Sequence, residues 1–310
     1  MPGYAMTQNP AAPILSFTIV PASAQDFERI ESALARFVEE SPDFSLSFHR
    51  REGSFVIGGH DELVLEAICA QLTTTAEIAS AELRIEYRET ICKQAEAEGK
   101  YIRQTGGSGN YGHCWLRVEP NAPGAGYEFI NEIKGGSVPK EYIKPIEQGI
   151  RGAMELGILA GFPLVDVKAI LFNGSCHDVD SNEMAFKFAG SIAFKEAARK
   201  ASPVLLEPVM AVEVTVPEEL MGVIVGDINS RRGRIEGIVH AAGSHVIKAT
   251  VPLAELLRSS HHGRPDYAMR FAGYEPVKRE GPPDDAPAYA VKPRGPGPKS
   301  GLVSDSPESG

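Results

Sequence analysis

Two hydrophobic periods alternate along the first third of the chain and predict a small mixed domain. A period of two over residues 14–20 and 83–87 is typical of strands, and alternating apolar positions over 44–57 predict a hairpin. Helical periods cover residues 25–40 and 61–72. The resulting order of strand, helix, strand, strand, helix, strand is that of a ferredoxin-like fold.

The first predicted helix has a start signal of its own. Ser23 and Asp26 have the spacing of a capping box, in which side chains satisfy the free amides of the first turn. The apolar residues that then share one helical face are Phe27, Ile30, Leu34, Phe37 and Val38.

The same order of elements recurs after residue 208. A strand over 209–216 precedes a helix opened by Pro217, and a hairpin follows over 234–251. A short helix over 253–257 and a strand over 267–271 complete the set. Two similar small domains are therefore expected to flank a different middle region.

Two glycine-rich loops stand out in that middle region. The first runs from Thr105 to His113, and the second runs from Gly174 to Glu183 and leads directly into an amphipathic helix. Glycine permits positive φ and a close approach of the backbone to a phosphate or sugar. Glycine-rich turns are common in hairpins, so the first loop alone is a weak motif.

Together the two loops resemble the tip loops of domain IV in elongation factor G. The resemblance extends over residues 13–277. It is carried further by Gly126-Tyr127-Glu128-Phe129-Ile130-Asn131, Gly135-Gly136, Pro139, Glu141-Tyr142-Ile143, Ala160-Gly161, Pro163-Leu164-Val165-Asp166-Val167 and Val204-Leu205-Leu206-Glu207-Pro208.

The resemblance implies an α+β fold class: two ferredoxin-like βαββαβ domains flank an elongated domain IV, which has a ribosomal-protein-like α+β fold. In that family the tip of domain IV enters the decoding centre of the small ribosomal subunit and helps to move transfer RNA. The implied partner is the ribosome, through its RNA and its factor-binding site. The expected division is a disordered N-terminus 1–12, domain III 13–91, domain IV 92–207, domain V 208–277 and a disordered proline-rich tail 278–310.

The sequence shows no counterpart of the family's GTPase domain or second domain. It contains no Gly-x-x-x-x-Gly-Lys-Ser/Thr loop, and the similar run Gly295–Ser300 lies in the proline-rich tail without a flanking strand and helix. We therefore expect no GTPase activity and no cofactor. A GTPase-bearing factor supplied in trans would be a further partner.

Charge permits an RNA partner without requiring one. The net charge is −10, but residues 13–91 carry 6 basic and 14 acidic residues, whereas residues 92–207 carry 13 and 14. Domain IV is thus nearly neutral, and phosphate contacts should supply only modest affinity. No apolar run approaches the roughly 18 residues that span a bilayer, and no secretion signal is present, so a cytoplasmic location is expected, with no membrane or DNA partner.

The resemblance assigns RNA contact to the tip loops. His177 occupies the position of the family's tip histidine, where an imidazole can hydrogen-bond to or stack on bases; the alternative is a histidine that caps the following helix alongside Asp180. Ser108 replaces a usual arginine and Cys176 a usual tyrosine, which weakens the expected contact. The candidate tip residues are Gly106, Gly107, Ser108, Gly109, Asn110, Tyr111, His113, Ser175, Cys176, His177 and Asp178.

A second set of candidates lies in the last domain, where arginines could contact ribosomal RNA phosphates. The alternative is a solvated turn. Between Glu255 and Arg258 about six residues of the family's usual second helix are missing. The candidates are Arg231, Arg232, Arg234, Arg258 and Arg264.

Cysteine and histidine chemistry is the third alternative. The four cysteines lack disulfide-type spacing and are expected to be free thiols. His113-Cys114 and Cys176-His177 could in principle form a zinc site or a nucleophilic pair. Neighbours in a strand point to opposite faces, however, so no metal is expected.

The sequence therefore leaves three alternative hypotheses for the function. The leading hypothesis is an elongation factor G-like translation protein without a GTPase domain, which binds the ribosome through the domain IV tip and acts by occupancy or with a GTPase in trans. The second is a module repurposed for a protein partner away from the ribosome. The third is a thiol or metal enzyme at the tip.

Overall fold

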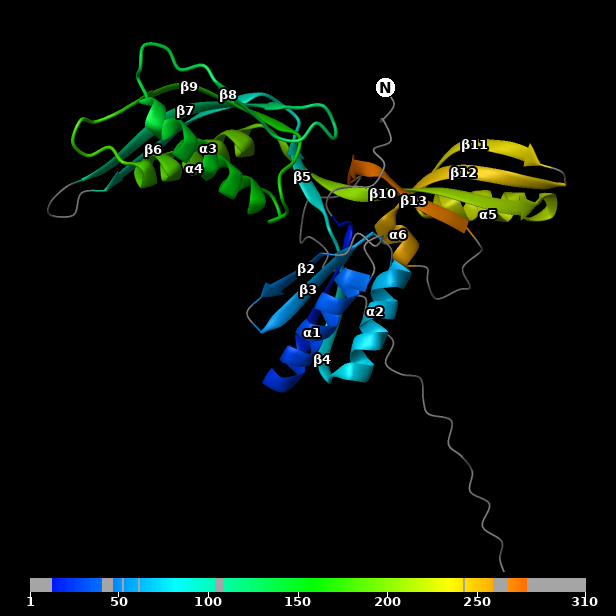
Figure 1. The fold of residues 1–310 in the computed structure, drawn as a ribbon. Coiled ribbons are helices and arrows are strands. Elements are labelled where there is room, and N and C mark those ends of the chain that lie inside the picture. Colours follow the sequence, from blue (N-terminus) through cyan, green and yellow to red (C-terminus); the bar gives the residue numbers. More distant parts are fainter. Residues whose placement is uncertain are drawn as a thin grey trace, which may run out of the picture. The chain divides into compact units, whose positions relative to one another are not determined.

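The computed structural model describes residues 13–40, 47–51, 53–60, 62–103, 109–241, 243–258 and 267–277. Within these ranges the chain is an α+β protein with three sheets (Figure 1). It divides into two compact units, one containing Leu15–Arg84 and the other Ile85–Ala286. The predicted disordered segments 1–12 and 278–310 lie outside the described residues.

The first unit has the predicted βαββαβ order. Its sheet has the strand order β2-β3-β1-β4, and β1 and β3 pair antiparallel. Leu15, Phe17 and Phe55 are buried in its core, whereas Tyr87 lies beyond the last strand, in which it was predicted. Its elements are β1 (Leu15–Pro21), α1 (Ala24–Glu40), β2 (Ser47–Arg51), β3 (Ser54–Gly59), α2 (Glu62–Thr75) and β4 (Ile78–Ile85).

The last domain repeats this topology. Its strand order is β11-β12-β10-β13, and β5 (Arg88–Ile91) adds to the same sheet by pairing with the start of β10. The long strand β10 exceeds the predicted range at its N-terminal end. The other elements are β10 (Pro203–Pro217), α5 (Glu218–Ser230), β11 (Arg234–Ala241), β12 (Ser244–Pro252), α6 (Leu253–Arg258) and β13 (Tyr267–Pro276).

The middle domain has a different topology, with a four-stranded sheet in the order β6-β7-β9-β8. The β6–β7 and β7–β9 pairs are antiparallel and the β8–β9 pair is parallel, with α3 as the crossover. The elements are β6 (Ala95–Arg103), β7 (Asn110–Pro120), β8 (Glu128–Asn131), α3 (Lys140–Glu155), β9 (Val167–Ser175) and α4 (Glu183–Lys200).

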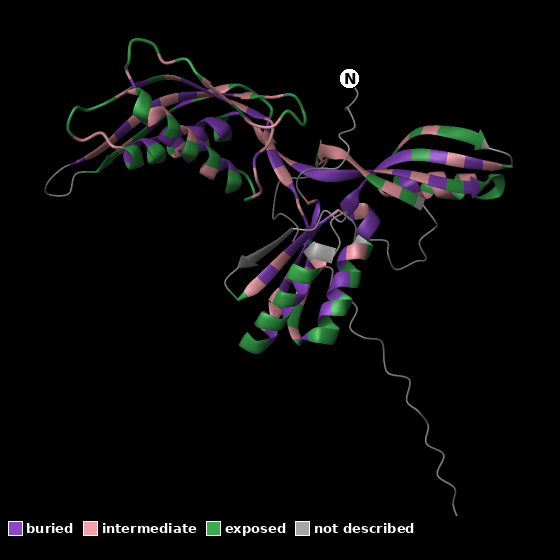
Figure 2. Cartoon of the chain, in the orientation of Figure 1, coloured by how far each residue is buried: buried purple, intermediate pink, exposed green. Residues whose placement is uncertain are grey.

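Helix α4 packs unusually close to β6 and β7 because small residues meet on both sides. Ala185, Ala189 and Ala193 recur every four residues along α4 and are fully buried. A Cβ at Gly112 on β7 would lie 2.3 Å from the backbone oxygen of Ala185. Figure 2 shows that the residues of α4 that face the sheet are buried and that those on its outer side are exposed.

A buried carboxylate fixes the connection into the middle domain. Glu89 in β5 is fully buried, and its two oxygens accept hydrogen bonds from the backbone amides of Ile158, Leu159, Ala160 and Phe162 at 2.6–3.1 Å. Four such bonds offset the cost of removing the carboxylate from water. The loop that contains the Ala160-Gly161 motif is thereby held against β5.

No helix in the described part of the chain is long and apolar enough to cross a membrane.

Candidate nucleic-acid interface

The sheet register brings the two glycine-rich loops to the same end of the middle domain. β7 begins at Asn110 and β9 ends at Ser175, and in this antiparallel pair His113 lies opposite Ser175. Of the predicted tip residues, Gly106, Gly107 and Ser108 lie outside the described residues. The structure places the rest within one loop cluster, formed by residues 109–113 and 175–182 and named the tip cluster below.

Asp180 ties the first loop to the second. Its Oδ1 accepts a hydrogen bond from the amide of Gly109 at 2.9 Å, and its backbone oxygen accepts one from the amide of Tyr111 at 2.7 Å. A Cβ at Gly109 would lie 2.9 Å from the Asp180 carboxyl carbon. A side chain at this position would therefore displace the Asp180 carboxylate that the Gly109 amide binds.

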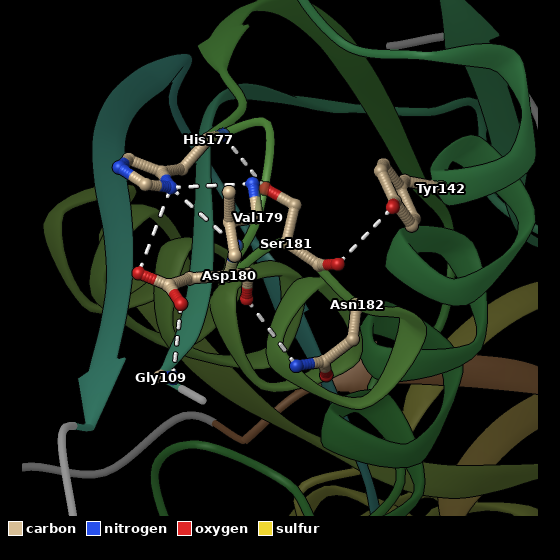
Figure 3. Close-up of polar contacts among 7 residues, drawn as sticks. All are labelled: Gly109, Tyr142, His177, Val179, Asp180, Ser181 and Asn182. Carbon is tan, nitrogen blue, oxygen red and sulfur yellow. Dashed lines mark hydrogen bonds and ion pairs between the residues drawn. The ribbon is translucent and has the colours of Figure 1, made fainter. Parts of the chain in front are cut away.

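His177 has one ring nitrogen committed to its own loop. Its Nδ1 lies 3.4 Å from the amides of Val179 and Asp180, which donate to it, and 3.5 Å from Oδ2 of Asp180 (Figure 3). These contacts turn Nδ1 toward the loop, so Nε2 lies on the outer edge of the ring. The side chain is 56% exposed, so its outer edge can meet a ligand.

The loop backbone around His177 is also held in place. The amide of His177 donates to the Ser181 hydroxyl at 2.8 Å, and the Ser181 amide donates to the His177 carbonyl at 3.2 Å. The Tyr142 hydroxyl donates to the Ser181 carbonyl at 3.2 Å. Tyr142 in turn stacks on buried Phe186, with ring centroids 4.4 Å apart. The exposed imidazole is thus connected to the core of the domain.

Helix α4 is capped by Asn182, and neither His177 nor Asp180 takes that place. The Asn182 Oδ1 accepts from the amide of Ala185 at 2.9 Å, and its Nδ2 donates to Oδ1 of Asn110 in the first loop at 2.7 Å. The sequence interpretation did not select Asn182, although an asparagine before a helical period is a cap signal. His177 caps only the preceding turn.

A hydroxyl and imidazole chain lies beside the exposed loop. Ser175 Oγ is 2.7 Å from the Tyr111 hydroxyl and 2.6 Å from Nδ1 of His113. His113 Nε2 lies 2.8 Å from a carboxylate oxygen of Glu98 on β6. These contacts fix the side chains of Tyr111 and His113 on the surface of the sheet. A ligand at the tip would therefore meet both side chains in set orientations.

The thiols and imidazoles of the tip do not converge. Cys114 is fully buried among core residues, and burial raises the pKa of its thiol to about 12, whereas His113 points to the opposite face. Cys176 is exposed. Within the described ranges, no group of three or more His, Cys, Asp or Glu side chains could hold a metal ion.

The arginines of the last domain differ sharply in their surroundings. Arg232 makes two hydrogen bonds to buried Glu207, at 2.7 and 3.0 Å, and one to Glu255 at 2.9 Å, and these partners raise its pKa. Arg231 forms a bidentate pair with Asp227.

The other arginine candidates are Arg234, Arg258 and Arg264. Arg234 is 64% exposed, and its contacts with Glu275 and Glu236 are long, at 3.5 and 3.7 Å. Arg258 ends α6, and Arg264 lies outside the described residues.

Three protein-family models match the chain over most of its length. They are elongation factor G domain III over residues 11–81, elongation factor G domain IV over 83–202 and the elongation factor G C-terminus over 204–283.

The fold also resembles a crystal structure of a protein from Thermus thermophilus, with 40% sequence identity and a TM-score of 0.67. The likeness covers 87% of this chain and 42% of that one, so this chain spans less than half the length of that protein.

Proposed function

Because the chain belongs to the elongation factor G family and carries its domains III, IV and C-terminal domain, we propose that it binds the ribosome through the tip of domain IV. The observation that carries this proposal is the ordered tip cluster. His177 has one ring nitrogen bound within the loop and the other edge free, while Tyr142 and Asn182 hold the loop to the core. A preorganised side chain of this kind binds RNA without first losing loop entropy.

The charge of the tip favours contact with bases over contact with phosphates. Asp178 is exposed beside His177, and Asp180 lies within the same loop. Two carboxylates there oppose a phosphate but leave hydrogen bonding and stacking by the imidazole available. We infer that the tip reads unpaired ribosomal bases, as such contacts are typical of RNA recognition at loops.

We propose that the chain acts by occupancy. The sequence contains no phosphate-binding loop of the Gly-x-x-x-x-Gly-Lys-Ser/Thr type that would hold the phosphates of GTP. The chain would block or hold the factor site, or cooperate with a GTPase-bearing factor supplied in trans. Either mode would place it in the cytoplasm with the ribosomes.

Co-sedimentation with intact ribosomes across a salt series tests the proposal. The His177→Ala variant is compared with Gln148→Ala, which changes an exposed residue in the middle of α3, away from the tip cluster. We expect saturable binding that falls at least tenfold for His177→Ala, about 1.4 kcal/mol, and is unchanged for Gln148→Ala. Absence of binding at low salt would contradict ribosome recognition and favour a protein partner.

A further inference from the structure

Two histidines face each other on the hairpin β11–β12 of the C-terminal domain. His240 and His245 are directly opposite in the antiparallel register, and their ring centroids lie 4.5 Å apart with an angle of 67° between the rings. His240 is exposed, whereas His245 is only 6% exposed. The pair belongs to neither the tip cluster nor the arginine set.

The buried histidine has an unsatisfied nitrogen. Nδ1 of His245 is inaccessible to solvent and has no hydrogen-bond partner within the described residues. Buried polar atoms in native proteins almost always have a partner, and one that lacks it suggests an ion or water that completes the site. The edge-on contact with His240 places a second imidazole next to it without supplying that bond.

The surroundings leave one direction of access. Val216 on β10 lies opposite His245 on its other side, so His240, His245 and Val216 form one row across three strands on the same face. Val216 and Ile247, two residues along β12, are both buried. Buried apolar side chains therefore lie beside His245, and the exposed His240 is the member of the pair that faces solvent.

We propose that His240 and His245 bind a divalent transition-metal ion, with water in the remaining coordination positions. Neutral imidazole is a preferred ligand for Zn²⁺, Ni²⁺ and Cu²⁺. Metal–nitrogen bonds of about 2.0–2.1 Å in tetrahedral geometry require two nitrogens roughly 3.3 Å apart. The ring centroids of His240 and His245 lie 4.5 Å apart, so the two imidazoles are near enough to share one ion.

The ligand set predicts an exchangeable site. Within the described ranges no third His, Cys, Asp or Glu joins the pair. A structural zinc site uses four protein ligands, so two imidazoles give weaker binding that follows the order of Cu²⁺ above Ni²⁺. The bound ion would cross-link β11 and β12 and add two positive charges to a domain whose residues 208–276 carry 7 basic and 8 acidic side chains.

Isothermal titration of the purified full chain with Ni²⁺ tests the site, after alkylation of the exposed thiols Cys92 and Cys176. We expect one saturable site per chain. Affinity should fall at least tenfold in His240→Ala and in His245→Gln, because each variant removes one of the two imidazole ligands.

Two controls test whether the bound Ni²⁺ is held by His240 and His245. The double variant His261→Ala/His262→Ala removes the neighbouring histidines of the sequence and should retain the site. Ni²⁺ should also raise the thermal unfolding midpoint of the native chain but not that of His240→Ala, whose exposed position leaves folding intact. Unchanged affinity in His240→Ala, or loss only in the His261/His262 variant, would overturn the proposal.

Discussion

At the residue scale, His177 holds a turn of its own loop and leaves one ring edge open, whereas the helix-capping role that the sequence offered as its alternative belongs to Asn182. Its Nδ1 fixes the turn at Val179 and Asp180, and its other edge is open. The turn contact and the open edge use different atoms of one ring, so the turn contact does not compete with the proposed RNA contact. A substitution can therefore separate them.

His177→Asn is the variant that separates these roles. An asparagine side chain can accept amides two and three residues ahead, as in an Asx turn, but has no ring. We expect the free energy of unfolding to stay within about 0.5 kcal/mol of the native value, while ribosome binding weakens as much as in His177→Ala. Urea unfolding measures the change in stability, and co-sedimentation measures the change in ribosome binding. Native-level binding by His177→Asn would show that the histidine serves the turn alone.

Arg232 has different surroundings from Arg234, the exposed arginine two residues later. Removing its side chain leaves buried Glu207 without a counter-charge, so Arg232→Ala should destabilise the C-terminal domain by about 2–4 kcal/mol. Arg234→Ala, at an exposed position, should cost less than about 0.5 kcal/mol. Urea unfolding distinguishes them. Equal small effects would argue against a structural Glu207–Arg232 pair and favour Arg232 as a free RNA contact.

At the scale of elements, the contact of α4 with β7 depends on the absence of a side chain. Gly112→Ala should destabilise the middle domain by about 1–3 kcal/mol, because the added Cβ meets the backbone of Ala185 and nothing flexible can yield. Gly152→Ala in α3 is the matched control. It has open space around its Cβ and should gain up to about 1 kcal/mol from helix propensity. Thermal unfolding of the two variants should shift in opposite directions, and a neutral Gly112→Ala would refute the packing argument.

The first domain should be sensitive to acid through the start of α1. Hydrogen bonds from the Ser23 hydroxyl and the Glu77 amide, with Arg29 nearby, lower the pKa of Asp26 below its ordinary value of 3.8. The ionised form is favoured in the folded state, so its contribution is present above that value and is lost as pH falls through the lower native pKa.

Asp26→Asn tests this dependence. We expect the unfolding midpoint of the variant to vary less than that of the native chain between about pH 5 and pH 2. Circular dichroism melts at several pH values measure the difference. Parallel curves for the two proteins would mean that other carboxyl groups set the acid limit.

The elements themselves were largely predictable because their signals are local. Hydrophobic periods gave both βαββαβ orders, and Ser23 with Asp26 gave the start of α1, where the Asp26 amide donates to the Ser23 hydroxyl. The addition of β5 to the sheet of β10 was not predicted. It depends on pairing between residues about 115 positions apart, and no local pattern encodes such a partner.

At the scale of the whole molecule, the candidate site was predictable in part. The family resemblance identified both tip loops, and register pairing places their described residues together. Glu207 as the partner of Arg232, and Asn182 as the cap that meets Asn110, were not found. Each needs the positions of side chains from distant segments, whereas a run of arginines by itself indicates only positive charge.

The central claim is that these domains bind the ribosome through the domain IV tip. Competition is its most direct test, in which the chain is added to ribosomes carrying a labelled full-length elongation factor G. The account predicts concentration-dependent displacement by the native chain, displacement by Gln148→Ala at the same concentrations, and a requirement for at least tenfold more His177→Ala. Ribosome binding without displacement, or equal displacement by His177→Ala, would contradict it.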